Sequence, residues 1–275
     1  VAALFIFFVV LQVQYLFGGE ANITETGFTY SEYARRGFSE LVAVAVISLL
    51  LYLGLGEISR RESPRQRRAF SLLSVLLMAL VLVILASAFQ RLLLYETAYG
   101  FTRLRTYSFI FIPWLALLLL ATIIFEIIRQ PGRFGPALLL AALGFGLTFG
   151  ALNVDGLIAR LNVQRAVRGE ELDGVYLTTL SSDAVPALVE MYRQPSLPKD
   201  LRAELGVVLA CRQALEGNQP AAKWKELSLS AVRAEGLMEQ VSAELRAYPV
   251  WQENGIWQVR VDGTPRNCFG ELRIN

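Results

Sequence analysis

The sequence predicts an all-α polytopic membrane domain of about five spanning helices, followed by a small α+β soluble domain. Hydrophobic residues make up 54% of the 275 residues and charged residues 18%, whereas soluble domains average roughly 45–50% and about 25%. Charge is also uneven along the chain. Residues 1–159 hold 12 Arg, no Lys and 9 acidic residues, and residues 160–275 hold 14 basic and 15 acidic residues. We therefore expect a transmembrane domain at 1–159 and a soluble domain at 160–275.

Five apolar runs predict the spanning helices, because a span needs about 20 mostly apolar residues. The runs are Val1–Phe17, Phe38–Gly56, Phe70–Tyr95, Ser108–Ile128 and Pro136–Ile158. The first run lacks the charged start and small-residue end of a signal peptide. We expect it to be a spanning helix cut by the start of the sequence, with further helices upstream.

Arginine placement predicts the orientation of these helices. Ile58–Ala69 holds five Arg and Arg129–Gly135 holds two, so the positive-inside rule makes both loops cytoplasmic. Alternation then places the loops at 18–37 and 91–107, and everything after residue 160, outside. Five Arg in these outer loops oppose the assignment: Arg35, Arg36, Arg91, Arg103 and Arg105.

Three polar clusters fall at the same predicted outer face and form a candidate rim. Its residues are Glu32, Tyr33, Arg35, Arg36, Glu96, Tyr99, Arg103, Arg105 and Asp155. One interpretation is structural: helix caps, i,i+4 ion pairs and interfacial anchors. A second is a pocket whose guanidinium groups bind an anion such as a lipid phosphate or a carboxylate. A third gives Glu32 or Glu96 a catalytic role.

Two features inside the apolar runs have a structural and a functional interpretation. Glu126 is an acid near a helix end, and a local pair with Arg129 competes with a functional intramembrane carboxylate. Glu40 has the same ambiguity. The Gly146-x-x-x-Gly150 spacing permits close helix packing.

The soluble domain is predicted to be helical over 160–247 and a β meander over 248–275. Three helices are expected, starting near Ser181, near Ser196 and near Ser230. Asn254-Gly255 and Asp262-Gly263 are hairpin signals between β-rich runs. The predicted strands are Tyr248–Gln252, Ile256–Val261 and Cys268–Ile274.

The two cysteines, Cys211 and Cys268, lie in a predicted helix and a predicted strand. If the domain is extracytoplasmic, a disulfide between them is expected, and if it is cytoplasmic, two buried thiols.

Several classes of chemistry have no counterpart in the sequence. The chain contains no His, which excludes His-dependent nucleophile triads and His-ligated metal sites within it. There is no phosphate loop and no dinucleotide fingerprint, and a net charge of +2 argues against nucleic acid as a partner. We predict no catalytic residue, no metal and no cofactor.

Three longer motifs resemble a bacterial membrane family. They are Glu32–Phe38 (EYARRGF), Glu96–Arg105 (ETAYGFTRLR) and Leu180–Leu188 (LSSDAVPAL). They resemble domain of unknown function 4173, which has domain 4153 as its relative. The resemblance covers about residues 28–230, implies a polytopic protein of the bacterial cytoplasmic membrane, and carries no activity, cofactor or catalytic residue.

Three functional hypotheses follow. The first is a non-enzymatic sensory, scaffold or assembly protein that binds an envelope partner or an anionic ligand at its outer face, where an envelope protein or an anionic lipid is the possible partner. The second is a transporter or channel subunit, in which Glu40 or Glu126 faces a water-filled interior. The third is a membrane enzyme that acts on lipid-linked substrates through Glu32 or Glu96.

Overall fold

The computed structural model describes residues 30–59, 63–217, 229–261 and 263–269, and the side chains of 30–41, 97, 98 and 229 are outside this description. The chain forms two compact units. The helical unit extends to Gly100 and continues over Leu104–Ala151. The C-terminal unit contains Phe101–Arg103 and the chain from Leu152 onward. The short link Phe101–Arg103 therefore belongs to the C-terminal unit, although it connects two helices of the helical unit.

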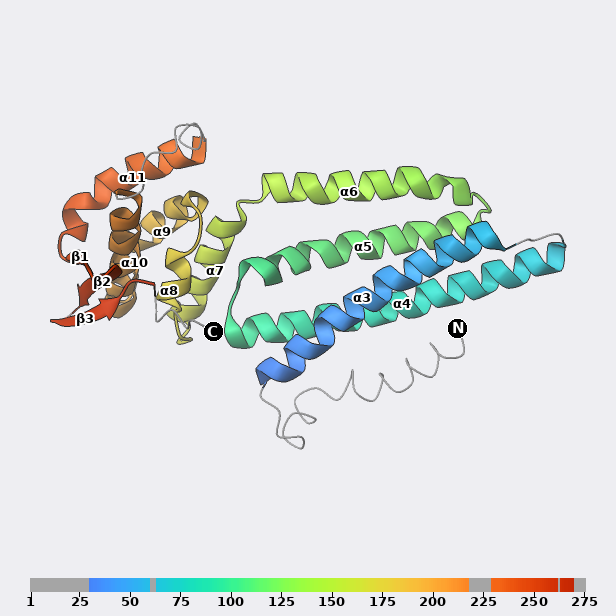
Figure 1. Ribbon diagram of the computed structural model, residues 1–275, viewed down its shortest axis with the longest axis horizontal. Helices are drawn as coiled ribbons and strands as arrows, with labels where there is room; N and C mark the ends of the chain where they lie inside the picture. Colours follow the sequence, from blue (N-terminus) through green and yellow to red (C-terminus); the bar gives the residue numbers. More distant parts are fainter. Residues whose placement is uncertain (1–29, 60–62, 218–228, 262, 270–275) are drawn as a thin grey trace. The chain divides into compact units, whose positions relative to one another are not determined.

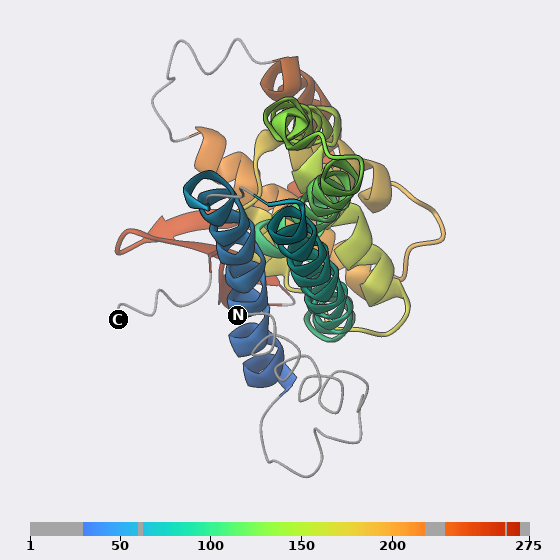
Figure 2. The same cartoon turned by 90° about the vertical axis from the view of Figure 1, so that its right-hand side faces the viewer.

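Four long helices build the described part of the helical unit (Figure 1). They are α3 (Tyr30–Ile58), α4 (Pro64–Tyr99), α5 (Arg103–Ile127) and α6 (Phe134–Ala151), with the 3₁₀ turn η1 (Pro131–Arg133) before α6. Ser63 begins α4 with a capping box, since its hydroxyl accepts from the Gln66 N–H and its own N–H donates to the Gln66 side chain. Figures 1 and 2 show α3 and α4 side by side.

Three of the described helices are long and apolar enough to cross a membrane: Pro64–Glu96, Arg103–Ile127 and Pro131–Ala151. The prediction of five spans is therefore not confirmed. The run Val1–Phe17 lies outside the described residues, and the run Phe38–Gly56 lies in α3, whose described apolar part, Val42–Ile58, is shorter.

The core of the helical unit lies between α3, α4 and α5. Met78, Val81 and Leu85 on α4 pack with Ala45 on α3 and Leu119 on α5, and all five are almost fully buried. These α4 positions are three or four residues apart and so share one face of the helix.

Helix α6 packs on α5 through aromatic side chains and one glycine. The Trp114 indole N–H donates to the Thr148 hydroxyl at 3.2 Å. A Cβ on Gly144 would overlap the Trp114 ring, whereas a Cβ on Gly146 or Gly150 would have no atom within 4 Å. Gly144 is thus the glycine that brings α6 close to α5, and the predicted Gly146–Gly150 pair makes no such approach among the described residues.

The fifth apolar run, Pro136–Ile158, is divided between two helices. Helix α6 ends at Ala151 and α7 (Val154–Val167) begins after Asn153, whose side-chain oxygen accepts from the Gly156 N–H at 2.7 Å. This N-cap starts α7 as a separate helix. Ile158 is fully buried and belongs to the C-terminal unit, which includes the chain from Leu152 onward.

The C-terminal unit consists of helices followed by a small sheet. Beyond α7 its helices are α8 (Gly174–Thr178), η2 (Ser182–Ala184), α9 (Val185–Tyr192), α10 (Lys199–Gly217) and α11 (Leu229–Leu245). Helices α9, α10 and α11 match the three predicted ones. Helices α7 and α8 were not expected.

The predicted antiparallel meander is confirmed, with one shift. Strands β1 (Val250–Glu253), β2 (Ile256–Val261) and β3 (Thr264–Asn267) pair in the order β1-β2-β3. Asn254 and Gly255 form the first turn, both with positive φ. Because Val261 already pairs with Thr264, β3 lies before the predicted strand Cys268–Ile274.

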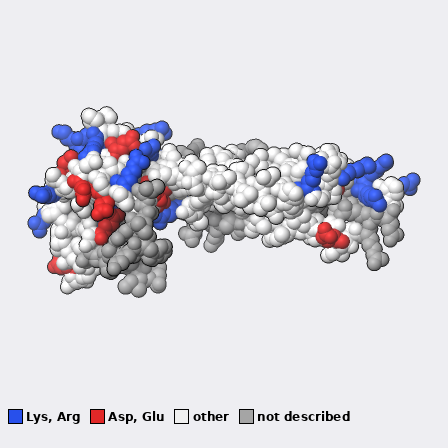
Figure 3. All heavy atoms as spheres, turned by 90° about the horizontal axis from the view of Figure 1, so that it is seen from above, with Lys and Arg blue, Asp and Glu red and all other residues white. Residues whose placement is uncertain are grey.

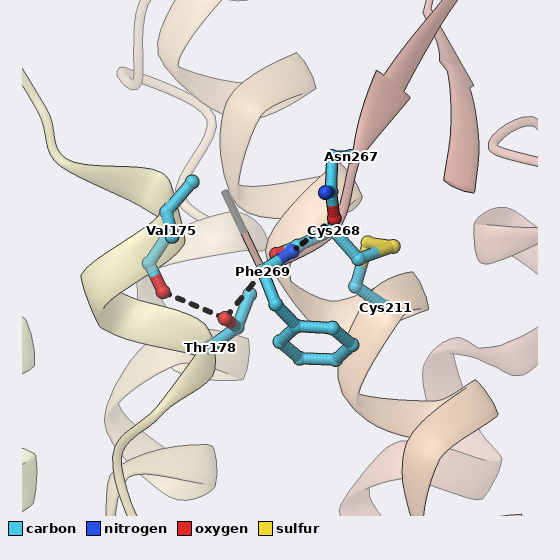
Figure 4. The surroundings of a disulfide bond; sticks show 6 residues. All are labelled: Val175, Thr178, Cys211, Asn267, Cys268 and Phe269. Carbon is cyan, nitrogen blue, oxygen red and sulfur yellow. Dashed lines mark hydrogen bonds between the residues drawn. A yellow bond between two sulfur atoms is a disulfide. The ribbon is translucent and has the colours of Figure 1, made fainter. Parts of the chain in front are cut away.

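A disulfide joins Cys211 on α10 to Cys268, directly after β3 (Figure 4). Both cysteines are almost fully buried and form a small core with Val207, Val259 and Val261. The disulfide therefore ties the meander to the helices of the C-terminal unit.

Candidate functional site

The nine rim residues predicted from the sequence fall into three groups. Glu32, Tyr33, Arg35 and Arg36 lie in the first turns of α3, but their side chains are outside the described residues. Arg103 and Asp155 come together in the C-terminal unit. The remaining residues, Glu96, Tyr99 and Arg105, lie at the end of α4 and the start of α5 in the helical unit.

Asp155 and Arg103 form a two-point ion pair. The Arg103 Nε donates to Asp155 Oδ1 at 2.8 Å and its Nη2 to Oδ2 at 2.5 Å. The backbone N–H of Ser181 also donates to Oδ2, at 2.7 Å. We call Arg103, Asp155 and Ser181 the Asp155 clamp.

The Asp155 clamp favours an ionised carboxylate. The Asp155 side chain is 8% exposed and that of Arg103 38%. Burial disfavours the charge, but hydrogen bonds from Arg103 and Ser181 and the charge of Arg103 outweigh it and hold the pKa of Asp155 below its usual value. Both carboxylate oxygens are thereby engaged within the protein.

Two further side chains hold the link Phe101–Arg103 in the C-terminal unit. Asn162 accepts from the Phe101 N–H and donates to the Phe101 carbonyl, both at 2.8 Å. The Tyr176 hydroxyl accepts from the Arg103 N–H at 2.8 Å. Sequence reasoning did not assign these two residues. The sequence does contain a pattern that could have identified Asn162. It lies seven residues after Asp155, and this spacing places both residues on one face of α7.

The segment around Ser181 is held from two other directions. The Asn153 amide donates to the Asp183 carbonyl at 2.7 Å. The guanidinium of Arg212 donates to the Leu180 carbonyl at 2.5 Å and to the Thr178 carbonyl at 3.3 Å. Arg212 is 5% exposed, and burial lowers the pKa of its guanidinium despite the nearby carboxylates of Glu216 and Asp155.

Arg105 has different partners from Arg103. Its Nη1 donates to the Gly100 carbonyl at 2.5 Å and to the Tyr99 carbonyl at 3.2 Å. Its guanidinium carbon lies 4.1 Å from the centre of the Tyr95 ring, and the Tyr95 and Tyr99 ring centres are 5.0 Å apart. We call Tyr95, Tyr99 and Arg105 the Arg105 cluster.

Among the side chains that the structure describes, two carboxyl groups of the helical unit are buried. Glu96 is 3% exposed, and its Oε1 has no hydrogen-bond partner among these residues. Glu126 is 8% exposed, and its Oε2 accepts from the Tyr52 hydroxyl at 2.7 Å. Glu126 therefore pairs with α3 across the core, and the predicted ion pair with Arg129 is not formed.

Comparison with known proteins gives one match. The family model for a Domain of unknown function (DUF4153) matches residues 1–191. The chain belongs to the DUF4153 family. The resemblance to domain 4173 is not confirmed. The match is to domain 4153, its expected relative. No curated protein and no solved structure matches the chain.

The DUF4153 match covers the Asp155 clamp but stops before α10. Arg103 and Ser181 belong to the second and third sequence motifs, and Asp155 accepts hydrogen bonds from both. Arg212 and both cysteines lie beyond residue 191. These motif residues thus hold the C-terminal unit together by charge and hydrogen bonding.

Proposed function

We propose that this DUF4153 protein is a non-enzymatic integral protein of a bacterial cytoplasmic membrane that presents its C-terminal unit outside the cell membrane to bind an envelope partner. The observation that carries the proposal is the Cys211–Cys268 disulfide. Structural disulfides persist in extracytoplasmic compartments and are rare in the cytosol. The three candidate spans, which are long and apolar enough to cross a membrane, support the membrane location.

Charge at the helix ends supports this orientation. Arg65, Arg67 and Arg68 at the start of α4, and Arg129 and Arg133 between α5 and α6, are exposed. Figure 3 shows basic side chains gathered at this end of the helical unit and a side surface almost bare of charge on the face in view. By the positive-inside rule this end is cytoplasmic. Alternation of α4, α5 and α6 then puts the link Phe101–Arg103 and the chain after Ala151 outside.

The outer face of the meander offers a surface for the partner. Along β2, Val259 and Val261 are buried and the alternate residue Arg260 is exposed. Arg260 lies over the half-buried Trp251 ring on β1, 5.2 Å from its centre, and Ile256 is 46% exposed. Trp and Arg are enriched at protein interfaces.

Reporter cysteines test the orientation. Val232 on α11 is 59% exposed and Gln130, between α5 and α6, is exposed. With Val232→Cys, a membrane-impermeant maleimide should label intact cells, and with Gln130→Cys it should label only permeabilised cells. In denaturing gels, Cys211 and Cys268 should react only after reduction. The reverse labelling pattern, or free native thiols, would overturn the proposal.

Binding is tested on the outer face of the meander. A photo-crosslinker at Gln258 should give a discrete adduct in intact cells that Trp251→Ala and Arg260→Ala both remove. The same probe at Glu170, an exposed residue after α7, is the matched control. An identical adduct pattern at Glu170 and Gln258 would contradict a specific surface.

A transporter or channel subunit is the second candidate, favoured by Glu126. Its buried carboxylate joins α3 to α5 through Tyr52, and intramembrane acids mark functional paths. A water-soluble carbodiimide with an amine should then modify Glu126 in membranes, as seen by peptide mass spectrometry, with Glu126→Gln as the control. Modification only after denaturation would show that water does not reach this carboxylate.

A further inference from the structure

Two kinds of contact hold the guanidinium of Arg105 in place: hydrogen bonds from one terminal nitrogen, and stacking of the guanidinium plane on an aromatic ring. Both of its printed hydrogen bonds come from Nη1, to the carbonyls of Tyr99 and Gly100. Its face stacks on Tyr95. A guanidinium has five N–H donors, and Nε and Nη2 of Arg105 donate to no residue that the structure describes. The edge made by these two nitrogens is the one that binds carboxylate or phosphate at two points.

In Arg103 the same Nε–Nη2 edge is occupied by a carboxylate. Its Nε and Nη2 bind the two carboxylate oxygens of Asp155. Arg105 forms no ion pair within the described chain, although its charge acts on the buried carboxyl group of Glu96. The carbonyls that it caps carry only about half an elementary charge in total. Arg105 is therefore a preorganised guanidinium whose two-point edge is open, whereas the same edge of Arg103 is occupied by Asp155.

The surroundings of Arg105 are those of a membrane interface. It lies at the junction between two candidate spans, Pro64–Glu96 and Arg103–Ile127. Two tyrosines lie beside it, and tyrosine is typical of the headgroup level. Leu93, Leu94 and Leu104 are 43%, 49% and 77% exposed, a surface that lipid chains cover in a bilayer.

We propose that the Arg105 cluster binds the phosphate group of a phospholipid. The Nε–Nη2 edge of Arg105 donates two hydrogen bonds to phosphate oxygens. The hydroxyl of Tyr99, a residue that is 44% exposed, is a further donor. The acyl chains lie along the exposed leucines. The ligand is a lipid rather than free phosphate because the site offers a partner for each part of a phospholipid. The guanidinium binds the phosphate group, and the exposed apolar side chains contact the acyl chains.

Lipid titration with native mass spectrometry tests the proposal on the full chain in detergent. Phosphatidylglycerol should bind more tightly than diacylglycerol with the same chains. Arg105→Gln should weaken phosphatidylglycerol binding on the order of tenfold, as expected for loss of a charge-assisted two-point contact, and leave diacylglycerol unchanged. Arg105→Lys should bind at an intermediate level, since an ammonium cannot make the two-point contact.

Two controls separate this site from general charge and from folding. Arg133→Gln removes an exposed arginine near the start of α6 and should leave the titration unchanged. Each variant should elute as the wild type does on size exclusion and keep its disulfide. Wild-type binding by Arg105→Gln, an equal loss in Arg133→Gln, or displacement of phosphatidylglycerol by inorganic phosphate would overturn the lipid site.

Discussion

Replacing Asp155 by asparagine tests the Asp155 clamp most directly. The change removes the charge that pairs with Arg103 and weakens the acceptor for the Ser181 N–H. Hydrogen bonds to charged groups contribute about 1.5–3 kcal/mol. Because the Arg103 side chain is 38% exposed, water recovers part of the loss, and we expect opening of this region to become easier by about 2 kcal/mol. That corresponds to about 30-fold faster exchange of the Ser181 amide.

Hydrogen exchange followed by mass spectrometry measures this effect on peptides that cover residues 175–188. Arg160→Gln is the matched control on the same helix. It breaks the Arg160–Glu190 pair, whose side chains are 54% and 59% exposed, and exposed pairs contribute about 0.2–1 kcal/mol. Exchange in Asp155→Asn that is no faster than in Arg160→Gln would refute the assignment of Asp155 as the centre of the clamp.

Three other predictions concern stability. Gly144→Ala should destabilise the α5–α6 contact by about 1–3 kcal/mol, because its Cβ would overlap the Trp114 ring. Gly146→Ala should have little effect, and equal thermal midpoints for the two variants in detergent would contradict this prediction. Cys268→Ser removes a disulfide between residues that are 57 apart in sequence. By the chain-entropy model, this should lower the free energy of unfolding of the C-terminal unit by about 4 kcal/mol. Urea unfolding followed by tryptophan fluorescence measures the change, and a midpoint equal to that of the wild type would show that the disulfide does not stabilise the unit. Because the pKa of Asp155 is lowered in the folded state, its contribution is present above its ordinary pKa of about 4 and is lost as the pH falls through that value toward the folded pKa. Thermal midpoints between about pH 6 and pH 3 should therefore fall less steeply in Asp155→Asn than in the wild type, and parallel curves would count against the shift.

Local patterns made much of the fold predictable. Apolar runs of sufficient length predict α4 and α5, and helical spacing predicts α9, α10 and α11, because each signal lies within one element. The dipeptide Asn254-Gly255 predicts its turn for the same reason, since both residues adopt positive φ. The Cys211–Cys268 bond was one of two alternatives, because its formation depends on the compartment and on a fold that brings the two residues together.

One local cap and two features that depend on tertiary contacts were missed. The Asn153 cap starts α7 within an apolar run whose composition continues into that helix, so the run appears as one helix in the sequence. Arg103 and Arg105 are two residues apart and look equivalent, yet one pairs with an acid 52 residues away and the other caps α4. Arg212 looks like a surface charge on a helix but is buried against the carbonyls of Thr178 and Leu180.

The division between Arg103 and Arg105 changes where function should be sought. Arg103 belongs to a longer sequence motif that resembles a known family, but its guanidinium is satisfied by Asp155, so its loss should first affect folding. A defect in an Arg103 variant would therefore say little about a ligand unless exchange at Ser181 stayed normal. Arg105 keeps its Nε–Nη2 edge free of described partners, and the outer face of the meander keeps Trp251 and Arg260 at the surface. Side chains in the Arg105 cluster and on the outer face of the meander can be replaced while the Asp155 clamp stays intact. Variants at these positions can therefore test ligand binding without a loss of stability at the clamp.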